Sequence, residues 1–104
     1  MDWKNEENKN LVKAILALKT SSETERFLRD LLTEQEIIEF GKRLQTAKML
    51  TNKIPYSTIE QITGLSSTTI ARVAKWLNGT GGGYKTIINR LHHHNSSQSR
   101  RELS

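Results

Sequence analysis

Apolar residues recur at steps of three and four along most of this chain, and this spacing restricts it to helices. The segment 3–19 carries the broadest such face, formed by Leu11, Val12, Ile15, Leu16 and Leu18. The chain has a single proline, Pro55, and few of the alternating apolar and polar runs that indicate strands. We therefore expect an all-α fold.

Three helix starts are marked by capping boxes, in which Ser or Thr is followed three residues later by Glu. The pairs are Ser22 with Glu25, Thr33 with Glu36, and Ser57 with Glu60. The second pair opens the longest predicted helix. It should end near Asn52, because Pro55 disfavours helical geometry in the residue before it.

Glycines and a further cap delimit the remaining helices. The short helix after Ser57 should end at Gly64, since glycine adopts the left-handed conformation without steric cost. Ser66 can then cap a fifth helix that runs through Leu77, and a sixth is expected over 82–91, after the linker NGTGGG. Residues 92–104 are polar and lack periodicity, so we predict a disordered tail there.

The length of 104 residues predicts one helical domain over 1–91, in which 1–52 supply dimerisation helices, 56–77 a helix-turn-helix and 82–91 a C-terminal helix. Hydrophobic residues make up 35%, which gives a thin core. The broad apolar face of residues 11–18 is hard to bury inside one such chain. Burial by a second subunit is the natural solution.

The composition also limits the cellular compartment and the kinds of chemical site that we expect. There is no cysteine, so disulfides, thiolate metal sites and thiol nucleophiles are excluded. No apolar run approaches the ~20 residues that cross a bilayer, and the start MDWKNEENKN lacks the layout of a signal peptide. We expect a cytoplasmic protein with no membrane partner.

Charge is distributed unevenly along the chain. Residues 1–40 carry 9 acidic and 6 basic side chains, a net −3, whereas residues 41–104 carry 2 acidic and 10 basic, a net +8. The chain as a whole has a net charge of +5. This asymmetry suggests an assembly half joined to a basic half that contacts an acidic partner.

The segment YSTIEQITGLSSTTIARVAKWL, residues 56–77, has the layout of a helix-turn-helix that binds double-stranded DNA. Small or hydroxylic residues at the start of its second helix would approach base edges, with donor-rich side chains further along. The candidate base-reading residues are Ser66, Ser67, Thr68, Ala71, Arg72 and Lys75. The candidate phosphate anchors are Tyr56, Thr58, Gln61 and Lys53, with Lys75 and Lys85.

Two other interpretations of this segment stay open. Two short helices around a glycine also occur in helical proteins that never bind DNA, and each surface residue named above can be an ordinary solvated side chain. The alternative function is a helical protein-interaction adaptor, in which the basic face docks an acidic partner and the helix-turn-helix is architectural.

Residues 31–77, LLTEQEIIEFGKRLQTAKMLTNKIPYSTIEQITGLSSTTIARVAKWL, resemble the core of the Trp repressor superfamily, in particular Trp-repressor-like proteins of YerC/YecD type. The shared pattern is LLT, acidic residues, Gly41, Arg43, a long helix and the ending TIxR at Thr69 to Arg72. The resemblance implies a six-helix fold and an intertwined homodimer. Its two helix-turn-helix heads would lie one DNA turn apart, ~34 Å, so the operator should be palindromic.

The resemblance also implies positions for a tryptophan corepressor. Those that match the family are Thr33, Arg43, Thr69 and Arg72. The next turn departs from the family, because Val73 replaces a small glycine and Trp76 replaces a serine. Both should obstruct the pocket, with the Trp76 indole buried near the space of the ligand, so we expect no tryptophan corepressor and no other cofactor. The alternative is that Trp76 is an outward-facing or interface aromatic and that Arg43 and Arg72 are solvated, in which case the question of a pocket does not arise.

Three further sequence patterns suggest binding sites, but we assign none to them. His92 to His94 could bind a transition metal, but a flexible run lacks the groups that fix imidazole geometry. GTGGGYK lacks the Gly-Lys-Ser/Thr ending and the preceding strand of a phosphate loop. Glu34, Glu36 and Glu39 have no metal-ligand spacing and fit a helix N-terminus instead. We therefore expect no metal and no enzymatic activity.

Overall fold

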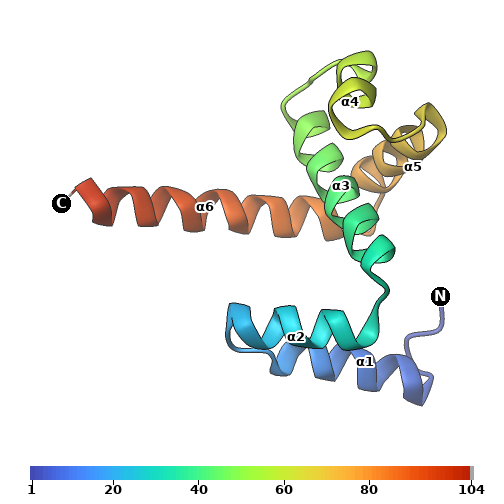
Figure 1. Ribbon diagram of the computed structural model, residues 1–104, viewed down its shortest axis with the longest axis vertical. Coiled ribbons are helices and arrows are strands. Elements are labelled where there is room, and N and C mark those ends of the chain that lie inside the picture. The colour runs from blue at the N-terminus through green and yellow to red at the C-terminus, as the bar shows by residue number, and fades with distance from the viewer. Residues whose placement is uncertain (104) are drawn as a thin grey trace. The chain divides into compact units, whose positions relative to one another are not determined.

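The computed structural model describes the backbone of residues 1–103 and the side chains of residues 1–93. Six α-helices and no strands make up this described part (Figure 1). They are α1 (Glu6–Ala17), α2 (Ser21–Leu31), α3 (Glu34–Thr51), α4 (Tyr56–Thr63), α5 (Ser67–Asn78) and α6 (Gly83–Leu103). The predicted all-α, six-helix fold is confirmed. None of these helices is both long and apolar enough to cross a membrane.

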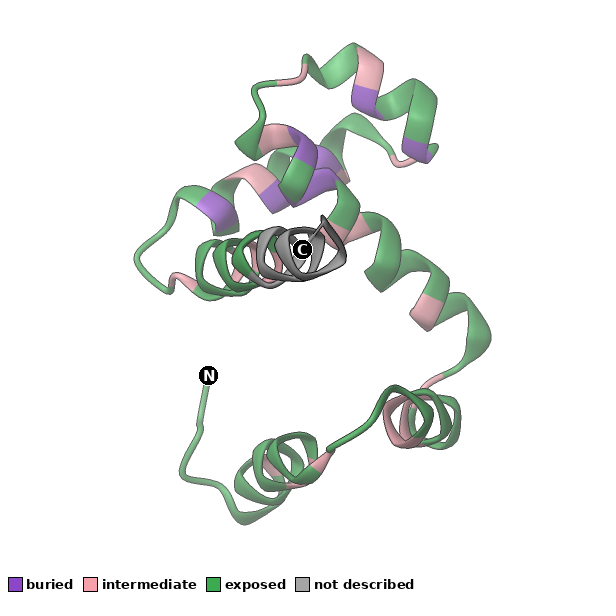
Figure 2. Ribbon diagram, turned by 90° about the vertical axis from the view of Figure 1, so that its left-hand side faces the viewer, coloured by how far each residue is buried: buried purple, intermediate pink, exposed green. Residues whose placement is uncertain are grey.

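The chain divides into two compact units, residues 1–37 and residues 38–104, where the sequence predicted one domain over 1–91. In the first unit, α1 and α2 contain no buried residue, as Figure 2 shows by the absence of purple on them. Leu16 remains 78% exposed. The apolar face that the sequence places on residues 11–18 is therefore not covered within the first unit itself.

Three of the predicted helix ends form as expected. At the start of α3, the Glu36 N–H donates to Thr33 Oγ1 (3.1 Å) and the Thr33 N–H donates to Glu36 Oε1 (2.9 Å). Hydrogen bonding of the Glu36 carboxyl to Thr33, first to its backbone N–H and then to its side chain, lowers the pKa of that carboxyl. α4 ends at Gly64 in the left-handed conformation, and Ser66 caps α5.

Two of the predicted capping boxes are wrong. The cap of α2 is Thr20 in place of Ser22: the Glu23 N–H donates to Thr20 Oγ1 (3.1 Å), and the Glu23 carboxylate accepts from the Lys19 N–H (3.3 Å). Hydroxyls at 20, 21 and 22 compete for this role, and the first one is used. α4 begins at Tyr56 with Pro55 as its N-cap residue, and it has no side-chain cap because proline carries no side-chain oxygen to accept from the first N–H groups of the helix.

The C-terminal tail also differs from the prediction. A disordered segment was expected over residues 92–104, but the backbone of α6 stays helical to Leu103. No proline or glycine follows Gly83, so nothing in the sequence stops a helix that has already begun. Periodicity is a signal of burial, and a solvated helix can lack it.

The core of the second unit lies where the C-terminal half of α3 meets α4 and α5, shown by the purple segments in Figure 2. Met49, Ile59 and Ile70 form its centre, one from each helix. The partly buried side chains of Leu50, Ile54 and Leu65 pack around them. α4 packs on α5 and α5 packs on α6, so this cluster fixes the orientation of α5.

Ile59 and Ile62 provide a matched test of this core, since both lie on α4 but are 0% and 57% exposed. We expect Ile59→Ala to lower the free energy of unfolding by about 2 to 5 kcal/mol, through lost burial and the cavity left behind. Ile62→Ala should lower the free energy of unfolding much less. Urea denaturation followed by circular dichroism measures both, and equal losses would contradict the assigned core.

Candidate nucleic-acid interface

The segment predicted as a helix-turn-helix folds as α4, a tight turn and α5. The Gly64 N–H donates to the Glu60 carbonyl (2.8 Å), and Gly64 has φ 74°, which reverses the chain. Thr63 is buried and locks the turn: its hydroxyl donates to the Ile59 carbonyl (2.7 Å) and accepts from the Leu65 N–H (3.2 Å). These bonds hold the end of α4 and the approach to α5 in one conformation.

The start of α5 is capped from within. Ser66 Oγ accepts from the Thr69 N–H (3.2 Å) and lies 3.1 Å from Thr69 Oγ1. The Ser66 hydroxyl, which the sequence predicts as the cap of this helix and places in the DNA-binding set, is engaged in the cap. Ser67 and Thr68, which follow it in the first turn, are exposed and have no such bond among the described side chains.

One side of α5 is buried and the other is exposed. Ile70, Val73 and Leu77 are buried against the core. The opposite side carries the rest of the predicted base-reading set, and every member of that set is exposed: Ser67, Thr68, Ala71, Arg72 and Lys75. We call these five residues the outer row of α5. The structure brings them together on one accessible helix face.

Four of the predicted phosphate anchors lie around α4, whereas the exposed Lys75 and Lys85 lie on α5 and in the first turn of α6. Tyr56 and Gln61 are exposed and Thr58 is partly buried, so Thr58 is the least accessible of them. Lys53 is exposed in the turn between α3 and α4 and has φ 58°. Its conformation was not foreseen, because this position usually holds glycine.

The turn at Lys53 closes α3 by two hydrogen bonds. The Ile54 N–H donates to the Met49 carbonyl (3.0 Å), and the Lys53 N–H donates to the Leu50 carbonyl (3.0 Å). This is the Schellman arrangement, in which the left-handed residue is followed by an apolar one that packs back on the helix. Ile54 does so, against the core cluster of Met49, Ile59 and Ile70.

The charge around α4 and α5 is almost wholly positive. Glu60 is the only acidic residue between positions 40 and 101. Arg72 and Lys75 therefore face solvent with no carboxylate on their own helix. An exposed, basic helix face beside polar hydroxyls is suited to a polyanion.

The positions matched to a corepressor site have other partners in the structure. Arg43 pairs with Glu39 (3.3 Å) and lies over the Phe40 ring (5.8 Å), and its Nε is buried without a hydrogen-bond partner. Thr33 caps α3, and Thr69 contacts Ser66. Arg72 belongs to the outer row.

The predicted burial of Trp76 is wrong in this chain. Trp76 is 65% exposed, because it lies off the helical stripe of Ile70, Val73 and Leu77. It borders an apolar hollow of about 410 Å³, together with Leu44, Tyr84, Ile87 and the glycines of the α5–α6 linker. Val73, in contrast, is 2% exposed, so its side chain is part of the core.

The histidines show no metal centre within the described side chains. The rings of His92 and His93 lie 6.2 Å apart, edge to face. No group of three or more potential ligands occurs in the part of the chain described, and the His94 side chain lies outside it. Gly81 and Gly82 lie in the linker before α6, which begins at Gly83.

Comparison with known proteins decides the family. The family model described as Trp repressor protein matches residues 6–92. The chain belongs to the Trp repressor family. This is a regulatory, DNA-binding family, and the match includes all of α1 to α5.

Individual relatives agree with this assignment. The chain is 40% identical to YerC of Bacillus subtilis (strain 168) over 81 residues, which are 78% of each protein. A TrpR-like protein from Eubacterium eligens superposes with a TM-score of 0.82 and 37% identity, over 86% of this chain and 93% of that one. For a structure described as a putative Trp repressor from Staphylococcus aureus, the TM-score is 0.81 and the identity is 36%, over 88% of this chain and 95% of that one.

The left-handed Lys53 gives a prediction about stability. We expect Lys53→Gly to raise the free energy of unfolding by up to about 1 kcal/mol, because glycine adopts a positive φ without the Cβ clash. Asn52→Gly is the control, since Asn52 has no positive φ, and it should lower stability or leave it unchanged. Thermal and urea denaturation measure both, and a less stable Lys53→Gly protein would contradict the strain assigned to this turn.

Proposed function

We propose that this protein is a dimeric, sequence-specific DNA-binding transcriptional regulator, most simply a repressor that covers a promoter. The outer row of α5 is the observation that carries the proposal. Its first members, Ser67 and Thr68, are short enough for the helix backbone to come close to base edges, and Arg72 offers paired donors one turn later. The family supports the same conclusion.

A homodimer is part of the proposal. α1 exposes the apolar side chains of Leu11, Val12, Ile15 and Leu16, and α3 exposes Ile38 and Phe40. Soluble monomers rarely leave such apolar surface open, so a second copy of this chain is the expected cover. Two copies related by a twofold axis would present two α5 helices to successive major grooves, ~34 Å apart on a palindrome.

Binding should depend steeply on salt. Lys53, Arg72 and Lys75 lie in and around the α4–α5 segment, and each phosphate that such groups neutralise releases condensed counterions. Tyr56, Thr58 and Gln61 would position the duplex without reading its sequence.

Replacement of outer-row side chains tests whether α5 reads sequence. We expect Thr68→Ala and Arg72→Ala each to weaken operator binding by about 1 to 3 kcal/mol and to relax preference at single base pairs. Arg90→Ala, an exposed change on α6, is the matched control and should leave the preference intact. Selection from random DNA supplies the operator, and fluorescence anisotropy measures the affinities.

Three outcomes would contradict this assignment. Selection that enriches no palindrome, with retention that is blind to sequence, would favour the adaptor, whose basic face binds an acidic protein. Equal losses for Arg72→Ala and Arg90→Ala would remove α5 as the reading helix. Sedimentation that shows monomers for Thr68→Ala or Arg72→Ala would place these residues in the subunit contact.

We also propose that free tryptophan does not gate this protein. Val73 fills core space beside Ile70 and Leu77 where the resemblance implies a small glycine. Arg43, which would have to stack on an indole, is held by Glu39 and Phe40. The exposed Trp76 does not itself block a ligand in the single chain, so the proposal rests on Val73 and Arg43.

Titration with L-tryptophan tests this proposal. Isothermal titration should show no saturable heat, and operator affinity should be equal with and without the amino acid. Val73→Gly is the informative variant: it should lose stability through a core cavity, and any tryptophan response that it gains would identify Val73 as the obstruction. Micromolar binding by the unaltered protein would overturn the proposal.

A further inference from the structure

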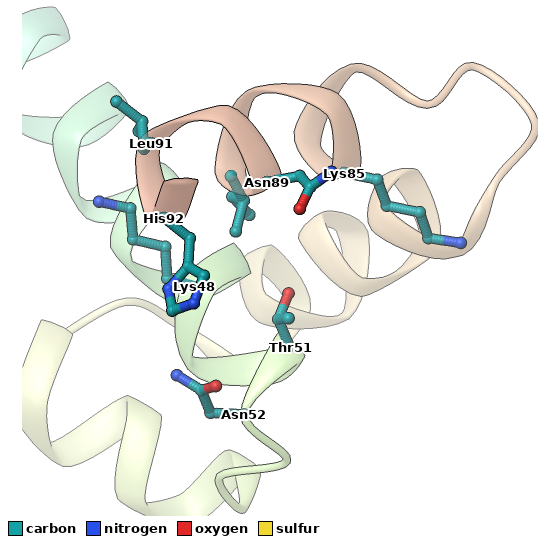
Figure 3. A pocket seen from close by; sticks show the side chains of 8 residues that line it. Lys48, Thr51, Asn52, Lys85, Asn89, Leu91 and His92 are labelled. Atoms are coloured by element: carbon teal, nitrogen blue, oxygen red, sulfur yellow. The ribbon is translucent and has the colours of Figure 1, made fainter. Parts of the chain in front are cut away.

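Glu60 is an isolated acidic residue in the basic part of the chain. Residues 41–104 carry 10 basic and 2 acidic side chains, and the other acidic residue, Glu102, lies beyond the described side chains. The same imbalance is seen between the end of α3 and α6, where a hollow of about 440 Å³ is lined by Lys48 and Lys85 but by no carboxylate (Figure 3). A carboxylate on α4 is therefore an exception that needs a physical reason.

Glu60 does not stabilise the helix in which it lies. The capping box that the sequence predicts between Ser57 and Glu60 does not form, because Pro55 is the N-cap residue of α4. Glu60 instead lies in the last turn of α4, where the negative end of the helix dipole disfavours a carboxylate. Among the described side chains the one ion pair joins Arg43 to Glu39, so Glu60 has no cation as a partner there. Stability of the fold gives no reason for a carboxylate at this position.

Glu60 lies among the candidate phosphate anchors of α4. Its side chain is exposed, whereas that of the preceding residue, Ile59, is buried. Tyr56 lies one helical turn before Glu60 and Gln61 follows it directly, and both are exposed. In a helix-turn-helix the first helix crosses the DNA backbone. A duplex that touches Tyr56 and Gln61 thus brings phosphates near the Glu60 carboxylate.

We propose that Glu60 is a determinant of DNA affinity, which weakens binding to DNA of any sequence by repelling the phosphates next to α4. This inference rests on the proposed DNA binding. Binding that is blind to sequence comes almost entirely from phosphate contacts. The Glu60 carboxylate offsets part of the attraction that Lys53, Arg72 and Lys75 exert on phosphates. It lowers the affinity for random and operator DNA by a similar factor, and contacts of the outer row to bases keep the operator complex the tighter of the two.

Glu60→Gln tests this proposal, because glutamine keeps the shape of the side chain and removes its charge. Fluorescence anisotropy of the full-length protein with a random duplex at low salt should show binding that is tighter by about threefold per subunit. This is the repulsion between two unit charges across roughly 7 Å of water. A dimer with both copies changed should gain about tenfold, and the gain should shrink as salt is raised, because salt screens exposed charges.

Glu25→Gln is the matched control, since it removes the same charge from an exposed position of α2. It should bind the random duplex as the unaltered protein does. Thermal denaturation should show that neither variant is less stable than the unaltered protein, so a change in affinity is not a change in folding.

Three results would overturn the inference while the proposed function stands. Equal affinities of Glu60→Gln and the unaltered protein for random DNA would mean that no phosphate lies near this carboxylate. Equal gains for Glu60→Gln and Glu25→Gln would assign the effect to net charge. Weaker operator binding by Glu60→Gln, with a changed preference at one cytosine, would make Glu60 a base-reading residue, because a carboxylate can accept from the cytosine amino group. If the unaltered protein binds no DNA, the proposed function fails and the inference fails with it.

Discussion

The contact of Ile59 with Ile70, completed by Met49, is the interaction on which the second unit depends. It joins α4 to α5 and both helices to the end of α3, and the two isoleucines are completely removed from solvent. The outer row of α5 is accessible only because the opposite side of that helix is held in this contact. The two turns next to it, at Lys53 and at Gly64, fix where α4 begins and ends, so the position of α5 follows from a small apolar cluster and two backbone bends.

The two units differ in how far they bury their own apolar side chains. The second unit buries a compact cluster from residues of its own. In the first unit, α1 and α2 have no buried residue, so their apolar face is not covered within that unit. In the homodimer that we propose, the apolar face of α1 would supply part of the hydrophobic free energy of association.

Local signals in the sequence predicted most of the helices. Thr33, Gly64 and Ser66 mark helix ends through bonds or conformations within three or four residues, and all three are used as expected. Where neighbouring hydroxyls compete, as at Thr20 and Ser22, sequence alone does not choose between them. The extent of α6 was missed because apolar periodicity reports burial and not helicity.

Features that depend on packing were harder to foresee. The exposure of Trp76 follows from the side of α5 that faces the core, and the hollow beside Lys48 and Lys85 from the way α6 packs near α3. Lys53 was expected on the surface, but its left-handed backbone comes from the Schellman closure of α3 and not from its residue type. The outer row of α5, in contrast, was predictable, because capping by Ser66 and the spacing of Ile70, Val73 and Leu77 determine it.

The two indoles of this chain are divided between its units. Trp3 belongs to the first unit and Trp76 to the second, and both are largely solvent-exposed. Intrinsic emission from each can thus be isolated by changing the other to phenylalanine. The chain carries its own pair of optical reporters, one in the first unit and one on α5, the helix that presents the outer row.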